Sequence, residues 1–300
     1  MKQFGKMKSL ALAVGVALGG LGIMPSAQAV HVAAENLGQA LIFPYYTVRG
    51  GWMTLFGITN TSNTLTVAVR VRFREAYNSR DVFDFALILS PNDVWTGWVA
   101  DAGDRPALFT EDKSCTVGEI SPTGTPFSTG LTSYTESSAD GGPTTPDRMK
   151  EGYVEMIMMG AAQVVMPMPN DDPTPLARGA IHVNGVPTNC QALRDAFLSS
   201  EQLGAAGIGP TPGLLRGEFQ LYATDPTSTP ADQPLNPLKG TFALVNGAKG
   251  LNAVGLPVHL ANFAQPDLAG LRRSPWFPAL RRRSSGSCES GGGVLAPSLP

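Results

Sequence analysis

The sequence is poor in the residue types that most enzymes and metal sites use. Only 15% of its 300 residues are charged, and it contains 3 histidines and 3 cysteines. This low charge excludes a coiled coil, and glycine does not recur at every third position as it does in collagen. The chain has no Cys and His spacing typical of zinc sites and no Gly-x-Ser-x-Gly segment typical of serine hydrolases. Its apolar fraction of 43% is nevertheless large enough to fill a globular core.

Long uncharged apolar runs are also missing, apart from one at the N-terminus. Three lysines within the first eight residues precede the apolar stretch 10–23, which is shorter than the roughly 20 residues needed to cross a bilayer. Ala27-Gln28-Ala29 follows as a small-x-small cleavage site. We therefore expect residues 1–29 to be a signal peptide. The mature chain is expected in the periplasm, on the cell surface or outside the cell, with no integral membrane span.

Basic charge is scarce in the main part of the chain. Residues 30–270 carry 14 basic and 23 acidic side chains, a net charge of −9. Nucleic acids are bound through basic surfaces, so this balance argues against nucleic-acid binding. The segment 271–300 differs, because it combines five arginines with serine and glycine runs. We expect it to be a disordered basic tail.

Period-two alternation dominates residues 30–119 and predicts β-strands. The clearest strand is 66–74, in which valines and a phenylalanine alternate with threonine, alanine and arginines. Similar runs occur at 38–46, 51–59, 80–89 and 94–99, separated by turn-forming residues, and Asn60–Asn63 is expected to be a hairpin loop. Short strands at this spacing predict an all-β fold, an antiparallel immunoglobulin-like β-sandwich.

The rest of the chain is expected to add a second β-rich part. Residues 120–150 are rich in Ser, Thr, Gly and Pro and are predicted to form a long surface loop. Residues 151–270 are predicted to hold this second part, with one short helix at 188–203 that Thr188 or Asn189 caps and a proline-rich loop at 166–179. Its expected strands are 151–159, 213–223, 239–246 and 254–263, with 213–223 and 239–246 forming a hairpin of two similar sequences.

Cys115 and Cys190 are expected to form a disulfide bond. Exported proteins meet oxidising conditions, and the third cysteine, Cys288, lies in the predicted tail. The bond would join the predicted helix to the loop after the first strand block. A closed loop of about 75 residues is worth about 4 kcal/mol in the chain-entropy model.

Several segments carry a resemblance to other proteins. These are Leu41–Val48, Thr59–Ser62, Val71–Glu75, Asn78–Val82 and Leu89–Gly97, to which Glu151–Glu155 adds. Together they resemble a group of exported proteobacterial proteins without an assigned function, mostly over residues 36–119. The resemblance implies an exported β-rich protein and supplies no catalytic residues. The tail departs from the pattern.

Two tryptophans are candidate contacts for a sugar. Trp95 and Trp98 lie on the strand predicted at 94–99 and could stack on a glycan. They are three positions apart, so a flat strand directs them to opposite faces. We expect one to belong to the core and the other to be exposed.

The second candidate ligand site is a basic stripe. Arg70, Arg72 and Arg74 share one face of the strand at 66–74 and could hold an anionic polymer. The competing interpretation is cross-strand ion pairing with the acidic residues that follow, Glu75, Asp81 or Asp84.

No catalytic residue, metal-ligand set or cofactor is predicted. The aspartates near predicted strand ends could serve a glycosidase, but aspartate is also common in turns; they are Asp81, Asp84, Asp93, Asp101 and Asp104. We therefore expect an exported, non-catalytic structural or binding protein of the cell surface or periplasm. Its partner would be a surface glycan or another envelope protein. The alternative is a protein that binds or degrades envelope polysaccharide.

Overall fold

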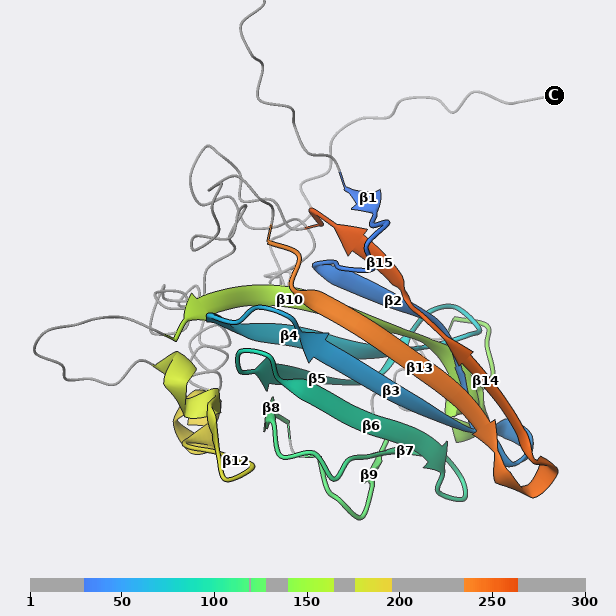
Figure 1. The fold of residues 1–300 in the computed structure, drawn as a ribbon. Helices are drawn as coiled ribbons and strands as arrows, with labels where there is room; N and C mark the ends of the chain where they lie inside the picture. Colours follow the sequence, from blue (N-terminus) through green and yellow to red (C-terminus); the bar gives the residue numbers. More distant parts are fainter. Residues whose placement is uncertain (1–29, 119, 128–139, 165–175, 196–234, 264–300) are drawn as a thin grey trace, which may run out of the picture.

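The computed structural model describes residues 30–118, 120–127, 140–164, 176–195 and 235–263. In this part of the chain two antiparallel sheets pack face to face (Figure 1). This arrangement confirms the predicted all-β sandwich; the immunoglobulin-like connectivity stays a prediction. The predicted signal peptide, the basic tail, the strand at 213–223 and most of the loop at 166–179 lie outside the described residues.

The sheets contain seven and six strands. Sheet A has, in spatial order, β1 (His31–Val32), β15 (Val258–Ala261), β2 (Ala40–Thr47), β10 (Glu151–Gln163), β4 (Leu65–Glu75), β5 (Asp81–Leu89) and β8 (Cys115–Val117). Sheet B has β14 (Leu251–Gly255), β13 (Leu238–Asn246), β3 (Met53–Asn60), β6 (Val94–Asp101), β7 (Pro106–Phe109) and β9 (Thr125–Pro126). A separate small hairpin consists of β11 (His182–Val183) and β12 (Val186–Pro187).

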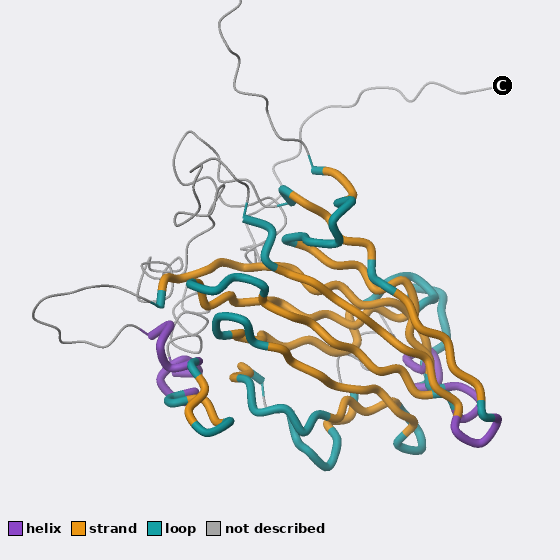
Figure 2. Tube along the Cα trace, viewed as in Figure 1, coloured by secondary structure: helices purple, strands orange, loops and turns teal. Residues whose placement is uncertain are grey.

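Helical segments lie at the periphery of the sheets, as Figure 2 shows. The 3₁₀ turns are η1 (Arg49–Gly51), η4 (Pro146–Lys150), η5 (Leu176–Ala180) and η6 (Gly247–Lys249). An α-helix begins at Cys190 and is described as far as residue 195. Asn189 caps it as predicted, because its Oδ1 accepts a hydrogen bond from the Ala192 N–H at 3.1 Å. The end of the predicted helix lies outside the described residues. None of the described helices is long and apolar enough to cross a membrane.

The two predicted parts of the chain are interleaved in the structure. β10 lies between β2 and β4, and β13 pairs with β3. Strands from the regions 30–119 and 151–270 therefore share both sheets, and the segment 120–150 does not mark a structural boundary. That segment also contributes to the core. Phe127 is fully buried, and its ring stacks on Phe83 with the centroids 5.1 Å apart.

The predicted hairpin loop Asn60–Asn63 instead crosses between the sheets, because β3 belongs to sheet B and β4 to sheet A. Asn60 is fully buried and holds this crossover. Its Nδ2 donates to the carbonyls of Leu65 at 2.7 Å and Ser90 at 2.8 Å, and its Oδ1 accepts from the Ser62 N–H at 3.1 Å. The side chain thus satisfies backbone groups where the chain leaves the strand ladders.

Two further predicted strands lie near the C-terminal end of the sandwich. The strand expected at 239–246 forms β13, whose partners among the described residues are β3 and β14; its predicted hairpin partner, 213–223, lies outside them. The single strand expected at 254–263 is divided into β14 in sheet B and β15 in sheet A. Pro257 lies at the break, where the chain passes from one sheet to the other and no ladder N–H is required.

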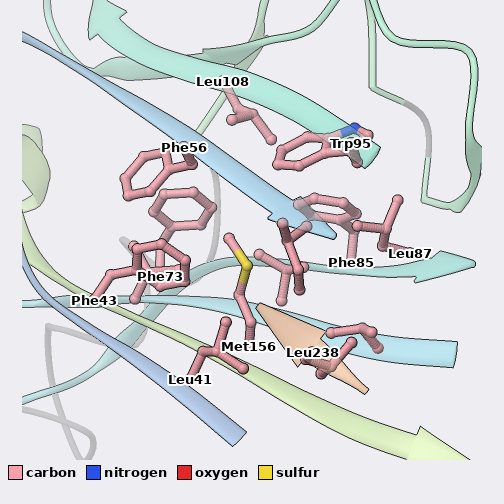
Figure 3. Close-up of a cluster of buried hydrophobic side chains, with 14 of the residues drawn as sticks. Leu41, Phe43, Phe56, Phe73, Phe85, Leu87, Trp95, Leu108, Met156 and Leu238 are labelled. Carbon is pink, nitrogen blue, oxygen red and sulfur yellow. The ribbon is translucent and has the colours of Figure 1, made fainter. Parts of the chain in front are cut away.

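Large apolar side chains fill the space between the sheets (Figure 3). The inward residues of β4 are Val67, Val69, Val71 and Phe73, all fully buried, as the alternation predicts. Phe56 of sheet B meets Phe73 edge-to-face at 5.7 Å between ring centroids. Such pairs add to the stabilisation that apolar burial provides.

The segment 176–195 covers one end of the outer face of sheet A. Its buried Ala177, Ala180 and Leu193 cluster with Ala68 of β4, and the hydroxyl of Thr66 donates to the Ala177 carbonyl at 3.0 Å. This cover explains why the outward side chains of Thr66 and Ala68 are buried.

The Cys115–Cys190 disulfide ties this cover to the sheet and confirms the predicted bond. The two Cα atoms lie 5.3 Å apart, within the range that a disulfide requires. Cys115 belongs to the edge strand β8, whereas the sequence predicted a loop at this position.

Candidate functional site

The arginine stripe is present but carries no net charge. Arg70 pairs with Asp84, Arg72 Nε lies 3.8 Å from Asp81 Oδ2, and Arg74 Nε lies 3.2 Å from Glu155 Oε2. Three cations therefore face three anions on β5 and β10. Two of the acidic residues expected to pair with the stripe, Asp81 and Asp84, do so. The sequence offered no signal for the third partner, because Glu155 lies 81 residues beyond Arg74.

Burial and charge act in opposite directions on Asp81. Burial raises the pKa of its carboxyl group above the ordinary value, while Arg74, Arg72 and Arg70 lower it. The three arginines thus stabilise the charged form of a half-buried acid on the outer face of sheet A. This arrangement favours cross-strand pairing over an anion-binding role for the stripe.

The two candidate tryptophans occupy opposite faces of β6, as expected. Trp95 is fully buried and lies 5.7 Å from the ring of Phe85, so it is a core residue and no longer a candidate ligand contact. Trp98 is half-buried on the outside of sheet B. It stacks on Phe109 with the ring centroids 5.6 Å apart and the planes within 9°.

The candidate glycosidase aspartates have structural partners. Asp101 binds Lys150 at 3.1 Å, and Asp104 binds Arg105 at 2.9 Å. Asp93 organises the β5–β6 turn, since its Oδ2 accepts from both the backbone N–H and the hydroxyl of Ser90.

His182 lies beside Ser90 and Asp93, which brings Ser, His and Asp side chains together. Its Nδ1 is 3.4 Å from Ser90 Oγ and 3.7 Å from Asp93 Oδ2. In a catalytic triad the two ring nitrogens divide these tasks, one facing the serine and the other the carboxylate. Here the same nitrogen faces both groups, so the arrangement is that of a hydrogen-bonded turn. Within the described ranges, no group of three or more His, Cys, Asp or Glu side chains could hold a metal ion.

An open depression with a volume of about 370 Å³ lies where β2 turns into β3. Its lining consists of Tyr45, Thr47, Arg49, Gly50, Trp52 and Leu244. We call it the Tyr45–Trp52 depression. Tyr45 is 39% exposed and Trp52 is half-buried. Two aromatic rings and a leucine thus line a surface that also offers polar groups.

Glycine and asparagine shape the turn that forms this depression. Gly50 and Gly51 have φ angles of 61° and 81°, a left-handed conformation that glycine adopts without steric cost. The side chain of Asn246 on β13 donates to the Gly50 carbonyl at 2.9 Å. The turn is thereby fixed against sheet B, with Trp52 at its end.

Arg49, which lines the depression, binds two carboxylates beside it, and we call these three side chains the rim. Arg49 donates through Nε to Glu151 at 3.0 Å and through Nη1 to Asp147 at 2.9 Å. The hydroxyl of Tyr45 donates to the other oxygen of Glu151 at 2.9 Å. The ordinary pKa of tyrosine, about 10, already leaves this hydroxyl protonated at neutral pH, and burial together with the bond to Glu151 raises the pKa of Tyr45 further. One guanidinium and two carboxylates leave this rim with one excess negative charge.

Sequence reasoning missed the Tyr45–Trp52 depression. The only local signal was a run of aromatic residues on both sides of the Gly50-Gly51 turn. The two carboxylates of the rim follow about 100 residues later, and β10 brings Glu151 beside β2. No family model, curated protein or solved structure matches this chain.

Proposed function

We propose that the mature chain is an exported, non-catalytic protein that binds a neutral glycan of the cell envelope. The Tyr45–Trp52 depression is the proposed binding site. The expectation of export rests on the signal-peptide pattern of residues 1–29. The observation that supports the ligand class is the combination of partly exposed aromatic rings with a hydrogen-bonding rim in one hollow of the surface.

The lining has the chemistry that a sugar ring requires. A pyranose presents an apolar face of C–H groups, which packs on aromatic rings such as Trp52 and Tyr45. Its hydroxyl groups need both donors and acceptors, which Arg49 and Glu151 supply at the rim. Because these two side chains already bind each other, they are held in position before a ligand arrives.

The charges favour a neutral ligand. The rim carries two carboxylates against one guanidinium, and residues 30–270 have a net charge of −9. The arginine stripe on sheet A, the best candidate for an acidic polymer, is paired with three acids. An acidic glycan would therefore be repelled by the surface as a whole.

The same geometry favours binding over hydrolysis. A glycosidase places two carboxyl groups on either side of the scissile bond, with roughly 5–10 Å between them. Asp147 and Glu151 instead both form ion pairs with the guanidinium of Arg49. A polysaccharide-degrading protein remains the alternative, and it is distinguished by the release of new reducing ends.

Calorimetric titration of the mature protein with neutral hexasaccharides tests the proposal. The probes are cellohexaose, maltohexaose and the hexamer of N-acetylglucosamine, with heparin as a polyanionic comparison. We expect one of the neutral probes to bind, and Trp52→Ala to weaken that binding at least about tenfold, or ~1.4 kcal/mol. The matched control is Trp98→Ala, which removes a half-buried tryptophan on the outside of sheet B.

Three results would overturn the proposal. They are the absence of binding to every neutral hexasaccharide, equal losses in the two tryptophan variants, and preferential binding of heparin. Incubation of the bound hexasaccharide with the protein, followed by assay of reducing ends, separates binding from hydrolysis. A steady release that Trp52→Ala abolishes would establish the degrading alternative.

A further inference from the structure

The edges of the two sheets differ in how well they are protected against pairing with another strand. β1 and β9 have two residues each, and β9 ends in Pro126. β8 has three residues and includes Cys115 of the disulfide. β14 (Leu251–Gly255) has five residues, with neither a charge nor a proline. Among the described residues no strand pairs with its outer side. Proteins commonly block such edges with the very features that β14 lacks.

The side chains of β14 are unusually exposed for apolar residues. Val254 is 78% exposed and Leu251 is 52% exposed. Val254 also starts a continuous apolar row across the outer face of sheet B, in which each residue lies opposite the next on the neighbouring strand. The row consists of Val254, Ala243, Leu55, Trp98 and Phe109. Contiguous apolar residues on a protein surface are common at interaction sites.

The uncharged edge of β14 suits pairing with a second copy of the chain. The main part of each molecule is acidic, so repulsion between two copies is smallest where their contact surface carries no charge. The outer face of sheet A carries ion pairs, whereas the row that begins at Val254 carries none. When two β14 strands pair in antiparallel orientation, no charged side chains face one another, because the strand contains none.

We propose that β14 pairs with β14 of a second copy in antiparallel orientation, with the two-fold axis at Ala253. Ala253 is the middle residue of the strand, so this register pairs its whole length. Val254 then lies opposite Asn252 of the second copy. The two B sheets join into one continuous sheet, with the apolar row of each molecule on the same face of it. Pro257 ends the pairing on either side. The result is a symmetric, closed dimer.

Sedimentation velocity of the mature chain in a Cys288→Ser background tests this dimer. We expect a reversible monomer–dimer equilibrium, because a single paired edge buries less than the ~1,600 Å² of a standard stable interface. Val254→Lys places a charge on the edge and should weaken dimerisation at least about tenfold. The control Val186→Lys alters a valine that is 56% exposed on the separate hairpin. Both substitutions are at exposed positions, and circular dichroism verifies that the variants fold.

A cysteine cross-link tests the register. Opposed residues in antiparallel strands have Cα atoms about 4.5–5.5 Å apart, within the range that a disulfide spans. Ala253→Cys should therefore give a covalent dimer on mild oxidation, and Val186→Cys should not. A monomer at every concentration up to about 500 µM, or a dimer that Val254→Lys leaves intact, would overturn the proposal. Neither outcome affects the glycan site, since none of these residues lines the depression.

Discussion

A buried ion pair links β4 to the segment that leads into β10. The side chains of Glu75 and Arg148 are 0% and 1% exposed, with Nη2 3.2 Å from Oε1. Arg148 also donates to Asp140 at 2.9 Å and to Asn78 at 3.0 Å. The sequence suggested Glu75 as a partner for the arginine stripe. The structure instead pairs it with an arginine 73 residues away.

Replacing Arg148 by methionine removes the charge while retaining an unbranched side chain. The Glu75 carboxylate then stays buried without a counterion, a defect that costs about 3–5 kcal/mol. It keeps three hydrogen bonds from backbone N–H groups, those of Tyr77, Asn78 and Arg80, at 2.8–3.1 Å. Because these bonds stabilise the carboxylate, we expect the lower end of that range, about 3 kcal/mol.

Urea unfolding at pH 7, extrapolated linearly to water, measures this loss. The control is Arg105→Met, which breaks an ion pair with Asp104, a side chain that is 65% exposed. Solvent screens that pair, so the control should lose less than about 1 kcal/mol. Equal losses in the two variants would refute the reasoning.

The pH dependence of the stability loss distinguishes an unpaired buried carboxylate from a simple packing defect. Burial alone would raise the pKa of Glu75, but Arg148 and the backbone N–H groups lower it overall. This contribution to wild-type stability is present above the unfolded pKa and is lost as the pH falls. In Arg148→Met burial is no longer opposed by the guanidinium, so protonation relieves the defect. The difference in stability between the two proteins should therefore narrow from pH 7 to pH 4; a constant difference would contradict this.

Two further predictions concern the disulfide and a buried histidine. Replacing both Cys115 and Cys190 by alanine should lower the free energy of unfolding by up to about 4 kcal/mol. It should also make the segment 176–195 more susceptible to proteases. An unchanged urea midpoint together with an unchanged cleavage pattern would contradict this prediction. His259 accepts the Gly240 N–H at 3.0 Å, and burial lowers its pKa. Its contribution to stability should thus be complete above the unfolded pKa of about 6.5 and decline as the pH falls. His259→Gln should flatten the stability curve between about pH 5 and 7, and identical curves for the two proteins would contradict this assignment.

Much of the strand content could be predicted from the sequence, because alternation reports which face of a strand is buried. The inward valines of β4 and the opposite orientations of Trp95 and Trp98 followed from this rule alone. Alternation does not show which other strand a given strand pairs with. For this reason the crossing at Asn60–Asn63 was predicted as a hairpin, and the position of β10 between β2 and β4 was missed.

The candidate site was harder to predict for the same reason. Tyr45 and Trp52 flank one turn, but Leu244 and the two carboxylates that bind Arg49 come from distant segments that only the sheet pairings bring close. The disulfide was predictable because the expected oxidising compartment and the small number of cysteines constrain it independently of topology.

Hydrogen–deuterium exchange on a chain that begins at Val30, with and without the neutral hexasaccharide that binds best, is the most direct test of the proposed function. Glycan binding at the depression should slow exchange of the backbone amides at 45–52 and 147–151, with no change along Arg70–Arg74. Slower exchange along the arginine stripe instead, or no change at 45–52 under saturating glycan, would contradict the account.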